Sequence, residues 1–212
     1  MVRHRVGIVI PALNESATIS NVVGAAMAYG LPIVVNDGST DQTACLATEA
    51  GAVVVSHEQN RGYDEALNSG FKKAAASGCE IIITLDADGQ HNPALIAGFI
   101  EKVDAGADMV VGIRDQFQRL GEHLFALYTN FRFGIKDPLS GIKAYRSSLY
   151  KALGHFDSYG SIGTELMIYA AKNTYKIDQL PFEVMERQGQ SRFGQTLQGN
   201  FKIFRALFLA RG

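Results

Sequence analysis

Short apolar runs recur along the first half of the chain, separated by longer stretches of helical character. The runs are RVGIVI (5–10), PIVVN (32–36), AVVVS (52–56), EIIITL (80–85) and DMVVGI (108–113). Continuously apolar segments of this length are typical of parallel strands whose two faces are both covered. We therefore predict that these five segments form one buried, mainly parallel sheet.

The stretches between the runs carry helix signals. They are 15–30, 41–52, 64–78 and 93–107, the last of which opens with Pro93 in its first turn. This alternation predicts a doubly wound α/β fold, a three-layer α/β/α sandwich. After Ile113 the pattern loses its period, and we expect only a helix over 162–173, an extended segment over 175–184 and a loop over 188–195. This second half is expected to carry acceptor specificity and a mobile loop.

Composition adds limits to this picture. The chain has 212 residues, 47% of them hydrophobic, which suits one large domain or one domain with a lid. Its 20 basic and 21 acidic residues nearly balance and Trp is absent, so we expect no nucleic-acid partner. Cys45 and Cys79 lack the spacing of a metal site or a disulfide framework, which indicates free thiols in a reducing compartment. Because no segment reaches the roughly 20 apolar residues of a membrane span, we predict a cytoplasmic location.

The end of the chain has an amphipathic pattern. In 201–212 one helical face carries Phe201, Phe204, Leu207 and Phe208, with basic residues among them. Such a helix suits peripheral contact with the anionic inner face of a membrane, or packing against the second subunit of a homodimer. Packing on the chain's own core is an equally good interpretation.

Polar, turn-forming segments follow four consecutive predicted strands. They are PALNES (11–16), NDGSTD (36–41), HEQNRG (57–62) and DADGQH (86–91). Ligands of open parallel sheets bind outside the carboxyl ends of the strands, so these four segments predict a ligand cleft. In the second segment Asp41 suits a helix cap, and Asp37 is left to accept hydrogen bonds from a base imide or ribose hydroxyls. The absence of GxGxxG and GxxxxGK[ST] disfavours dinucleotide and Walker-type phosphate binding.

Asp86 and Asp88 are the strongest chemical signal. Residues two apart on an extended backbone point to the same side, and two facing carboxylates repel unless a cation joins them. Mg²⁺ or Mn²⁺ prefers such oxygen ligands, and Gln90 offers another oxygen two residues on. A calcium EF-hand loop does not fit, because its Gly and Glu positions hold His91 and Ala97. An aspartyl-phosphate hydrolase motif fits less well, since it usually follows the first strand.

The four segments, read as PALNE, VNDGSTD, NRGYDEALNSGF and DADGQH, together resemble the family 2 glycosyltransferases of GT-A fold. DPLSGIKAYR (137–146) and RQGQS (187–191) are similar to the branch that contains dolichol-phosphate mannosyltransferase and bacterial polyprenyl-phosphate sugar transferases. The resemblance implies a catalytic domain over 1–195, with a nucleotide-sugar half at 1–113 and an acceptor half at 114–195. An amphipathic helix over 196–212 would follow.

The resemblance also implies roles for single residues. Those expected to bind the nucleotide sugar are Pro11, Ala12, Asn14, Glu15, Asp37, Gly62 and Asp86, and those expected to bind Mg²⁺ or Mn²⁺ are Asp86, Asp88 and Gln90. Asp137 matches an acidic residue near the reacting centre, and Glu165 remains although Gly163 replaces the usual acidic residue two positions earlier. Acceptor contacts are expected from Arg114, Arg132, Ser140, Gly141, Arg187, Ser191 and Arg192, because guanidinium groups suit phosphate geometry.

These observations predict a metal-dependent inverting glycosyltransferase that moves a sugar from a nucleotide-sugar donor to a polyprenyl phosphate. A saccharide hydroxyl is the alternative acceptor, and it would need a general base, for which Asp137 and Glu165 are the candidates. Gly163 favours a third hypothesis, a sugar-nucleotide binding module without turnover. A nucleotidyltransferase would want a Gly-rich basic loop after the first strand, which PALNES is not.

Overall fold

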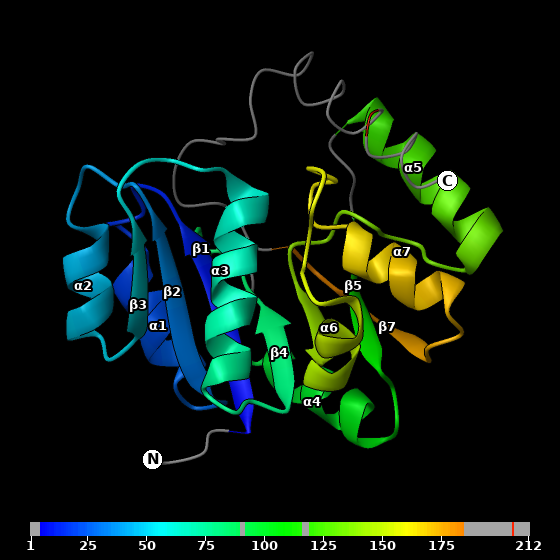
Figure 1. The fold of residues 1–212 in the computed structure, drawn as a ribbon, viewed down its shortest axis with the longest axis horizontal. Coiled ribbons are helices and arrows are strands. Elements are labelled where there is room, and N and C mark those ends of the chain that lie inside the picture. Colours follow the sequence, from blue (N-terminus) through cyan, green and yellow to red (C-terminus); the bar gives the residue numbers. More distant parts are fainter. Residues whose placement is uncertain (1–4, 90–91, 116–118, 185–204, 206–212) are drawn as a thin grey trace.

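The computed structural model describes residues 5–89, 92–115, 119–184 and 205, and within them one mixed sheet forms the centre of the molecule (Figure 1). Its strands are β1 (Val6–Ala12), β2 (Leu31–Asp37), β3 (Val53–His57), β4 (Ile81–Thr84), β5 (Met109–Arg114), β6 (Lys143–Arg146) and β7 (Ile177–Phe182). Its helices are α1 (Ile19–Ala26), α2 (Thr43–Glu49), α3 (Tyr63–Ala76), α4 (Leu95–Asp104), α5 (Leu120–Phe133), α6 (Ser147–Leu153) and α7 (Glu165–Lys172).

The strand order is β3-β2-β1-β4-β6-β5-β7. β1 pairs in parallel with β2 and β4, β2 with β3, and β5 with β7, whereas β6 runs antiparallel between β4 and β5. The five strands and the extended segment predicted from the sequence are therefore confirmed, and the mainly parallel character of the sheet with them. β6, α5 and α6 were not predicted.

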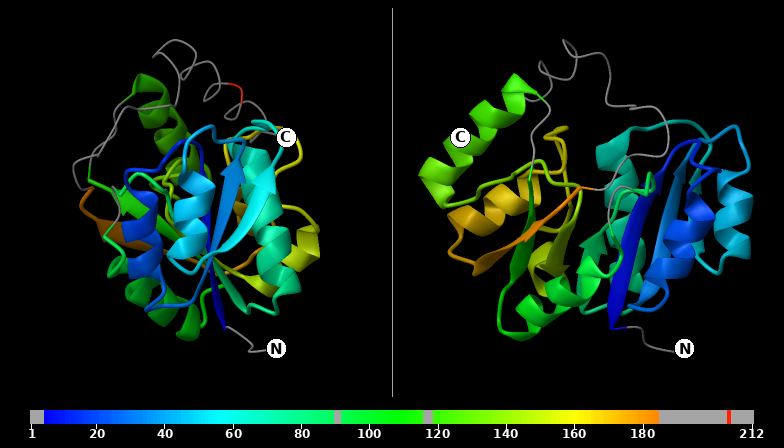
Figure 2. Two further views of the ribbon diagram at one scale, coloured as in Figure 1. Left: turned by 90° about the vertical axis from the view of Figure 1, so that its left-hand side faces the viewer. Right: turned by 180° about the vertical axis from the view of Figure 1, so that it is seen from behind.

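Helices cover both faces of the sheet, as the predicted three-layer sandwich requires (Figure 2). On one face α1, α2 and α4 pack over a core that includes Ile8, Ile10 and Phe99. On the other face α3, α6 and α7 pack over a core that includes Leu67 and Phe71. Burial of both faces explains why the parallel strands are apolar along their whole length.

α3 connects the two halves of the chain. Its first turn carries Asp64 and Glu65 and its last turn Lys73, which complement the helix dipole. From its buried side Phe71 contacts Tyr145 of β6 edge to face, with ring centroids 5.3 Å apart. Phe71 and Phe156 are closer still, at 4.4 Å. This aromatic cluster holds α3 against β6 and the loop that follows α6.

α5 lies outside the two helix layers, near the end of the molecule toward which β1–β4 point (Figures 1 and 2). Phe125 and Thr129 are fully buried on its inner side, and Gly134 ends the helix in the left-handed conformation. No helix of the described residues is long and apolar enough to cross a membrane. The predicted helix over 196–212 falls outside the described residues apart from Arg205, whose guanidinium donates to the carbonyl of Gly160 at 3.2 Å.

Candidate functional site

The carboxyl ends of β1–β4 meet at one edge of the sheet, and each of the four polar segments begins there. The register pairs Ala12 with Asn36 and Asp37 with His57, so the first three strands end side by side. Pro11 and Ala12 are the last two residues of β1 itself, and Ala12 is buried. The sequence prediction that these segments converge is thus confirmed.

The loops after β1 and β2 are joined by hydrogen bonds. The backbone N–H of Asn14 donates to Ser39 Oγ at 2.9 Å, and Asn14 Oδ1 accepts from the N–H of Thr40 at 2.7 Å. The N–H of Glu15 donates to Thr43 Oγ1 at 2.7 Å. Asn14 has a positive φ of 50°, a conformation that Asn tolerates better than most residues. The structure therefore gives Asn14 and Glu15 a clear role in fixing this edge of the cleft.

Asp41 holds the start of α2, although the N-cap position itself falls on Gln42. Its Oδ1 accepts from the N–H of Thr43 at 3.0 Å, and its Oδ2 accepts from the N–H of Ser16 at 3.2 Å. Burial alone would raise the pKa of Asp41, but the hydrogen bonds from Thr43 and Ser16 outweigh it and lower the pKa to about 2. The capping carboxylate stays ionised at neutral pH.

Asp37 organises the loop after β3. Its Oδ1 accepts from His57 Nδ1 at 2.7 Å and from the N–H of Arg61 at 2.9 Å, and its Oδ2 accepts from the N–H of Gly62 at 2.9 Å. The other ring nitrogen of His57 lies 2.8 Å from Ser69 Oγ on α3. These contacts use three of the roughly four acceptor positions of the carboxylate. Gly62, at a positive φ of 94°, gives the loop the turn that this arrangement needs.

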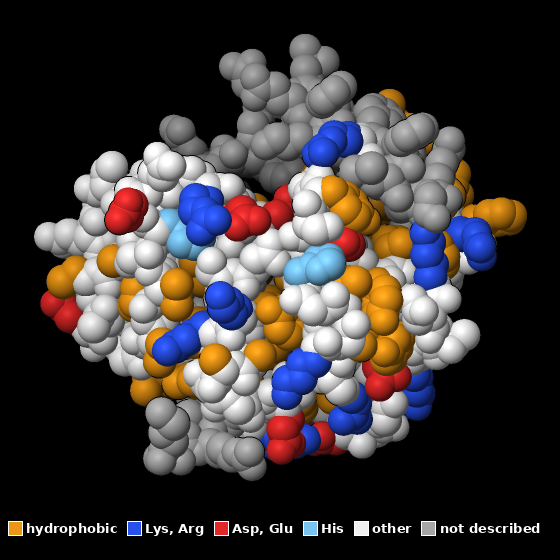
Figure 3. Space-filling view, in the orientation of Figure 1, with side chains coloured by type: hydrophobic (Ala, Val, Ile, Leu, Met, Phe, Trp, Pro, Cys, Tyr) orange, Lys and Arg blue, Asp and Glu red, His pale blue; other side chains and the backbone are white. Residues whose placement is uncertain are grey.

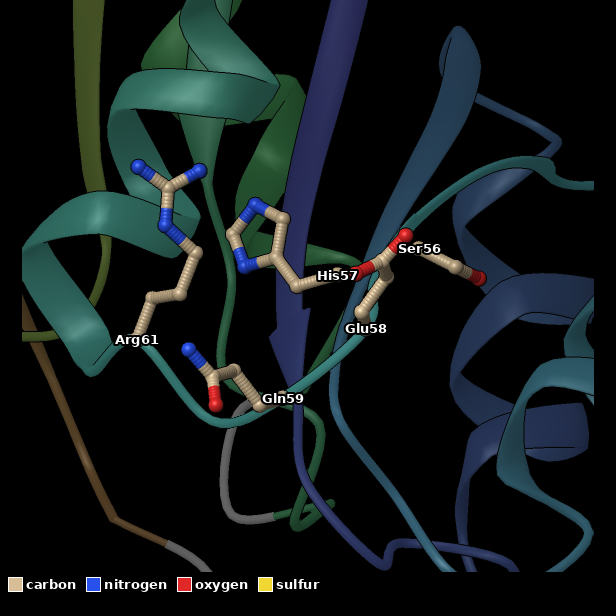
Figure 4. Close-up of a pocket in the computed structure, with 5 residues that line it drawn as sticks. All are labelled: Ser56, His57, Glu58, Gln59 and Arg61. Atoms are coloured by element: carbon tan, nitrogen blue, oxygen red, sulfur yellow. The ribbon is translucent and has the colours of Figure 1, made fainter.

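A pocket of about 310 Å³ lies beside this loop. It is lined by Ser56, His57, Glu58, Gln59 and Arg61. In Figure 4 the ring of His57 lies on the side of its strand that faces the Arg61 side chain. All the lining residues come from the segment 56–61, so Asp86 and Asp88 do not line this pocket.

Asp86 and Asp88 follow β4 on a tightly held loop. Leu85 and Ala87, which alternate with them, are buried in the core beneath the sheet. Thr18 Oγ1 donates to the carbonyl of Ala87 at 2.7 Å and fixes the loop to the start of α1. Asp86 is half-buried, and Asp88, in the turn that follows, is only 7% exposed. That the two carboxylates face one space stays a prediction.

Both carboxylates also act on one phenol. Tyr63 as a whole is 37% exposed, but burial of its hydroxyl raises its pKa, and the charge of Asp86 raises it further, with a weaker contribution from Asp88. Asp86 lies tightly against Gly141, because a Cβ atom on Gly141 would meet Asp86 Oδ2 at 1.9 Å. Gly141 is itself fixed to β4, since its carbonyl accepts from Thr84 Oγ1 at 2.8 Å. Gly141 therefore provides the space in which the Asp86 carboxylate sits.

The pair Asp86 and Asp88 suits a hard divalent cation. Among the described residues no group of three His, Cys, Asp or Glu side chains is arranged to hold a metal ion, and Gln90 lies outside them. Two carboxylates are nevertheless the usual protein share of a Mg²⁺ or Mn²⁺ site whose other ligands are substrate phosphate oxygens and water. The carboxylate oxygens of Asp86 and Asp88, and the space left by the missing side chain of Gly141, fit such an ion.

The second half brings a buried ion-pair network to the same edge. Asp137 is fully buried, and Arg114 Nε donates to its Oδ2 at 2.8 Å while Arg114 Nη2 donates to its Oδ1 at 2.9 Å. Arg114 also lies 3.2 Å from Glu122 Oε2, and Arg119 lies 3.0 Å from Glu122 Oε1. Burial lowers the pKa of Arg114, but Asp137 and Glu122 outweigh that effect and raise it. Both oxygens of Asp137 are thus engaged in positioning Arg114.

Lys143 is a site residue that the sequence reasoning missed. It is only 4% exposed, and its backbone N–H donates to Thr84 Oγ1 at 3.1 Å in the strand pair β4–β6. Burial lowers the pKa of its ammonium to about 8, although the charges of Asp137 and Asp86 act in the opposite direction. The signal in the sequence was a two-residue spacing: Lys143 and Tyr145 share one face of β6, and Gly141 comes two residues before Lys143.

Glu165 locks the loop that precedes α7. Its Oε1 lies 2.8 Å from His155 Nε2, and its Oε2 accepts from the N–H of Ser158 at 2.5 Å. Gly163 has a positive φ of 67°, and a Cβ there would lie 3.3 Å from the ring of Phe156. An acidic side chain at position 163 would be strained in this loop, so the departure from the family pattern matches the local backbone.

The same loop is tied to α3 by one amide. Asn68 Oδ1 accepts from the N–H of Phe156 at 3.0 Å and of Asp157 at 3.2 Å, and Asn68 Nδ2 donates to the carbonyl of Asp157 at 2.6 Å. The Asp157 carboxylate in turn accepts from the N–H of Gly160 at 2.7 Å and of Ser161 at 3.0 Å. Asn68 was not predicted as a site residue, because its partners lie 88 and 89 positions away in the sequence.

The remaining predicted acceptor residues are only partly brought together. Ser140 is buried next to Gly141, and its hydroxyl donates to the carbonyl of Ile142 at 3.3 Å. Arg132 lies in the last turn of α5, with its guanidinium 5.2 Å from the ring centroid of Phe133. The other three, Arg187, Ser191 and Arg192, lie outside the described residues.

Known proteins resemble this chain in sequence and in fold. The model of glycosyl transferase family 2 matches residues 7–163. The UDP-N-acetylglucosamine--dolichyl-phosphate N-acetylglucosaminyltransferase of Methanococcus voltae is 29% identical, over 96% of this chain and 95% of that protein. The polyprenol monophosphomannose synthase of Mycolicibacterium smegmatis is 30% identical, over 87% of this chain and 79% of that protein.

Among solved structures, glucosyl-3-phosphoglycerate synthase from Mycobacterium tuberculosis has a similar fold. It was solved in complex with Mn²⁺, uridine diphosphate and glucosyl-3-phosphoglycerate. The match has a TM-score of 0.79 at 24% identity and covers 98% of this chain and 80% of that one. At this identity the similarity establishes the shared fold.

Proposed function

The chain belongs to glycosyl transferase family 2 and is a glycosyltransferase, and from this premise we propose that it transfers a sugar from a nucleotide-sugar donor to a polyprenyl phosphate. The relatives whose names specify dolichyl phosphate or polyprenol as the acceptor align along most of the chain, which supports this acceptor class. We further propose that transfer inverts the anomeric centre and depends on Mg²⁺ or Mn²⁺.

The observation that carries the proposal is the group of charges around Asp86. Lys143 is buried and Arg114 is partly buried, and both cations act electrostatically on Asp86, at the edge where the donor loops end. Cations beside an acidic pair suit a substrate that brings its own phosphate groups. Asp86 and Asp88 would hold the divalent ion, and the ion would supply charge stabilisation to the leaving diphosphate.

The engagement of the two candidate bases favours a phosphate acceptor over a saccharide hydroxyl. A hydroxyl acceptor needs a base to take its proton, whereas a phosphate is already anionic near neutral pH. Asp137 is fully buried with both oxygens bound to Arg114, and Glu165 is bound to His155 and Ser158. In this arrangement Asp137 acts through Arg114, and Arg114 and Lys143 orient the phosphate groups.

The nucleoside end of the donor is proposed to lie toward Asp37. Its remaining acceptor position and the adjoining pocket at 56–61 suit the hydrogen-bond donors of a base or a ribose. Asn14 and Glu15 hold the opposite loop in place. This placement leaves the diphosphate over Asp86 and Asp88 and the sugar toward Gly141.

The direct test incubates the purified chain with a panel of nucleotide sugars, a short polyprenyl phosphate and either Mg²⁺ or Mn²⁺, and identifies products by mass spectrometry. Asp88→Asn should reduce transfer by at least about 10²-fold, because half of the carboxylate pair is lost. Asp104→Asn, which removes a surface carboxylate paired with Arg5 at the opposite edge of the sheet, is the control and should keep full activity.

Three other results would count against the proposal. Transfer only to saccharide acceptors would assign the alternative substrate class. Donor binding without any turnover would make the chain a sugar-nucleotide binding module. Equal activity of Asp88→Asn and the unmodified protein would remove the metal from the mechanism.

A further inference from the structure

The outer face of α5 carries an uninterrupted row of exposed apolar side chains. Leu120 is 69% exposed, Leu124 41%, Leu127 67% and Phe131 90%. Their spacing of four, three and four residues places them on one side of the helix. They make up four of the six exposed large hydrophobic residues found in the described part of the chain, so this concentration is specific to α5.

α5 itself carries no exposed acidic side chain beside this row. The one acidic residue of α5, Glu122, is buried and paired with Arg114 and Arg119. Arg132 and Lys136 are exposed at the end of the helix beside Phe131. Figure 3 shows hydrophobic side chains at the α5 side of the molecule next to basic ones.

The helix is held firmly to the catalytic edge. At its start, the pairing of Glu122 with Arg114 joins α5 to the network around Asp137. At its end, Thr129 Oγ1 donates to the carbonyl of Ile135 at 2.8 Å, which fixes the turn leading to Asp137. The outer face of α5 therefore has a fixed position relative to the site.

We propose that the outer face of α5 (Leu120, Leu124, Leu127 and Phe131, with Arg132 and Lys136) docks on the surface of an anionic lipid bilayer. Apolar side chains beside cations, on a helix whose only carboxylate is buried, complement acyl chains and negative headgroups. A stable protein interface typically uses about 20–30 residues a side, far more than this single helix face offers. The choice of a bilayer rests on the proposed function, because an acceptor with a polyprenyl chain resides in a membrane.

The test is flotation of the full chain with vesicles of phosphatidylcholine containing phosphatidylglycerol. The unmodified protein should float with them, and the double variant Leu124→Glu, Leu127→Glu should bind at least about tenfold more weakly, because two inserted apolar side chains become charged. Met27→Glu is the matched control, since Met27 is 51% exposed on α1 and lies outside the α5 face. It should float like the unmodified protein.

Activity provides a second measurement. Transfer to a short, water-soluble polyprenyl phosphate without vesicles should be unchanged in the double variant, while transfer to a long-chain acceptor in vesicles should fall by a similar factor. Failure of all transfer together with flotation that depends on the α5 face would overturn the proposed acceptor and leave the docking surface standing.

Three outcomes would overturn the docking proposal. The first is absence of flotation of the unmodified protein, and the second is equal flotation of the double variant. The third is a dimer that the double variant dissociates in sedimentation, which would assign the face to a second copy of the chain. Equal flotation with purely phosphatidylcholine vesicles would overturn the contribution of Arg132 and Lys136.

Discussion

Replacement of Gly141 by Ala should disable the site without removing any charged group. The added Cβ would lie 1.9 Å from Asp86 Oδ2 and 2.7 Å from Asp86 Cγ. Ordinary contacts between non-bonded heavy atoms are about 3.5 Å, so one partner must move by more than about 1 Å. Gly141 is not in a positive-φ conformation, and its carbonyl is held by Thr84. The Asp86 carboxylate is therefore the group that moves.

A displacement of about 1 Å in a positioning group costs on the order of 10²-fold in rate. We expect Gly141→Ala to lower kcat/KM by that factor and to raise the Mn²⁺ concentration needed for half-maximal transfer. The thermal unfolding midpoint should change little, because Asp86 is only half-buried and can turn toward solvent. Initial rates over a Mn²⁺ series, and Mn²⁺ binding measured by electron paramagnetic resonance, test both expectations.

Gly24→Ala is the matched control. Position 24 lies in α1, and a Cβ there would meet nothing within 4 Å. This variant should keep full activity and gain roughly 0.5–1 kcal/mol of stability from the better helix propensity. If Gly141→Ala shows the metal dependence and the rate of the unmodified protein, the close approach of Gly141 and Asp86 has no part in catalysis.

Two further predictions concern buried polar groups. In metal-free protein the fall in the pKa of Lys143 from 10.5 to about 8 corresponds, at about 1.36 kcal/mol per pH unit, to roughly 3 kcal/mol against the charged form. Since the unfolded chain holds this proton to higher pH, the free energy of unfolding should rise with pH between about 8 and 10.5. The variant Lys143→Met should lack that rise in urea titrations and should be more stable than the unmodified protein at pH 7. Its transfer activity should be strongly reduced. Asn68→Ala should cost about 2–4 kcal/mol in the same titration, because buried groups of the Phe156–Asp157 backbone lose their partner, whereas Asn130→Ala on the exposed side of α5 should cost little. A stability of Asn68→Ala equal to that of Asn130→Ala would refute the role of the amide.

The first half of the fold was predictable because its strands are buried on both faces. Such strands must be apolar throughout, and the sequence marks them without reference to their neighbours. The helix boundaries were less accurate. The first helix was predicted over 15–30 but α1 begins at Ile19, because Glu15 and Thr18 belong to the loop that contacts Thr43 and Ala87.

The second half was harder to predict because its elements have mixed faces. β6 has four residues, with Lys143 and Arg146 at its two ends, so no apolar run marks it. α5 buries Phe125 on its inner side while it exposes Leu124 and Leu127, and an apolar residue on both sides erases the single stripe by which a helix is recognised. The property that hid α5 from prediction is the one that supports its contact with a bilayer.

The residues of the candidate site likewise fall into two groups, those with a local sequence signal and those whose partners are distant in the sequence. Asp86 and Asp88 were predictable because their signal is local, two residues in one loop. The partners of Asp37 are 20 to 25 positions away, and those of Arg114 are up to 23 positions away. Such contacts arise from the packing of whole elements, and no pattern of residue types along the chain specifies them.

The charges of the site give a reason why the donor should bind together with a divalent ion. Asp86 and Asp137 act on both Arg114 and Lys143, and Asp64 also acts on Lys143. Together with Asp88, which follows Asp86 in the same loop, these carboxylates exceed the two cations by two charges near neutral pH, while Glu122 is balanced by Arg119. An anionic donor would be repelled by this excess. A divalent ion at Asp86 and Asp88 would cancel it, so donor affinity should depend on the ion. Lys143 alone does not achieve this, because Asp137 already balances Arg114 and Lys143 offsets only one of the other three carboxylates. Under the proposed function, the buried lysine reduces the negative charge of the site, and the ion that accompanies the donor neutralises the rest.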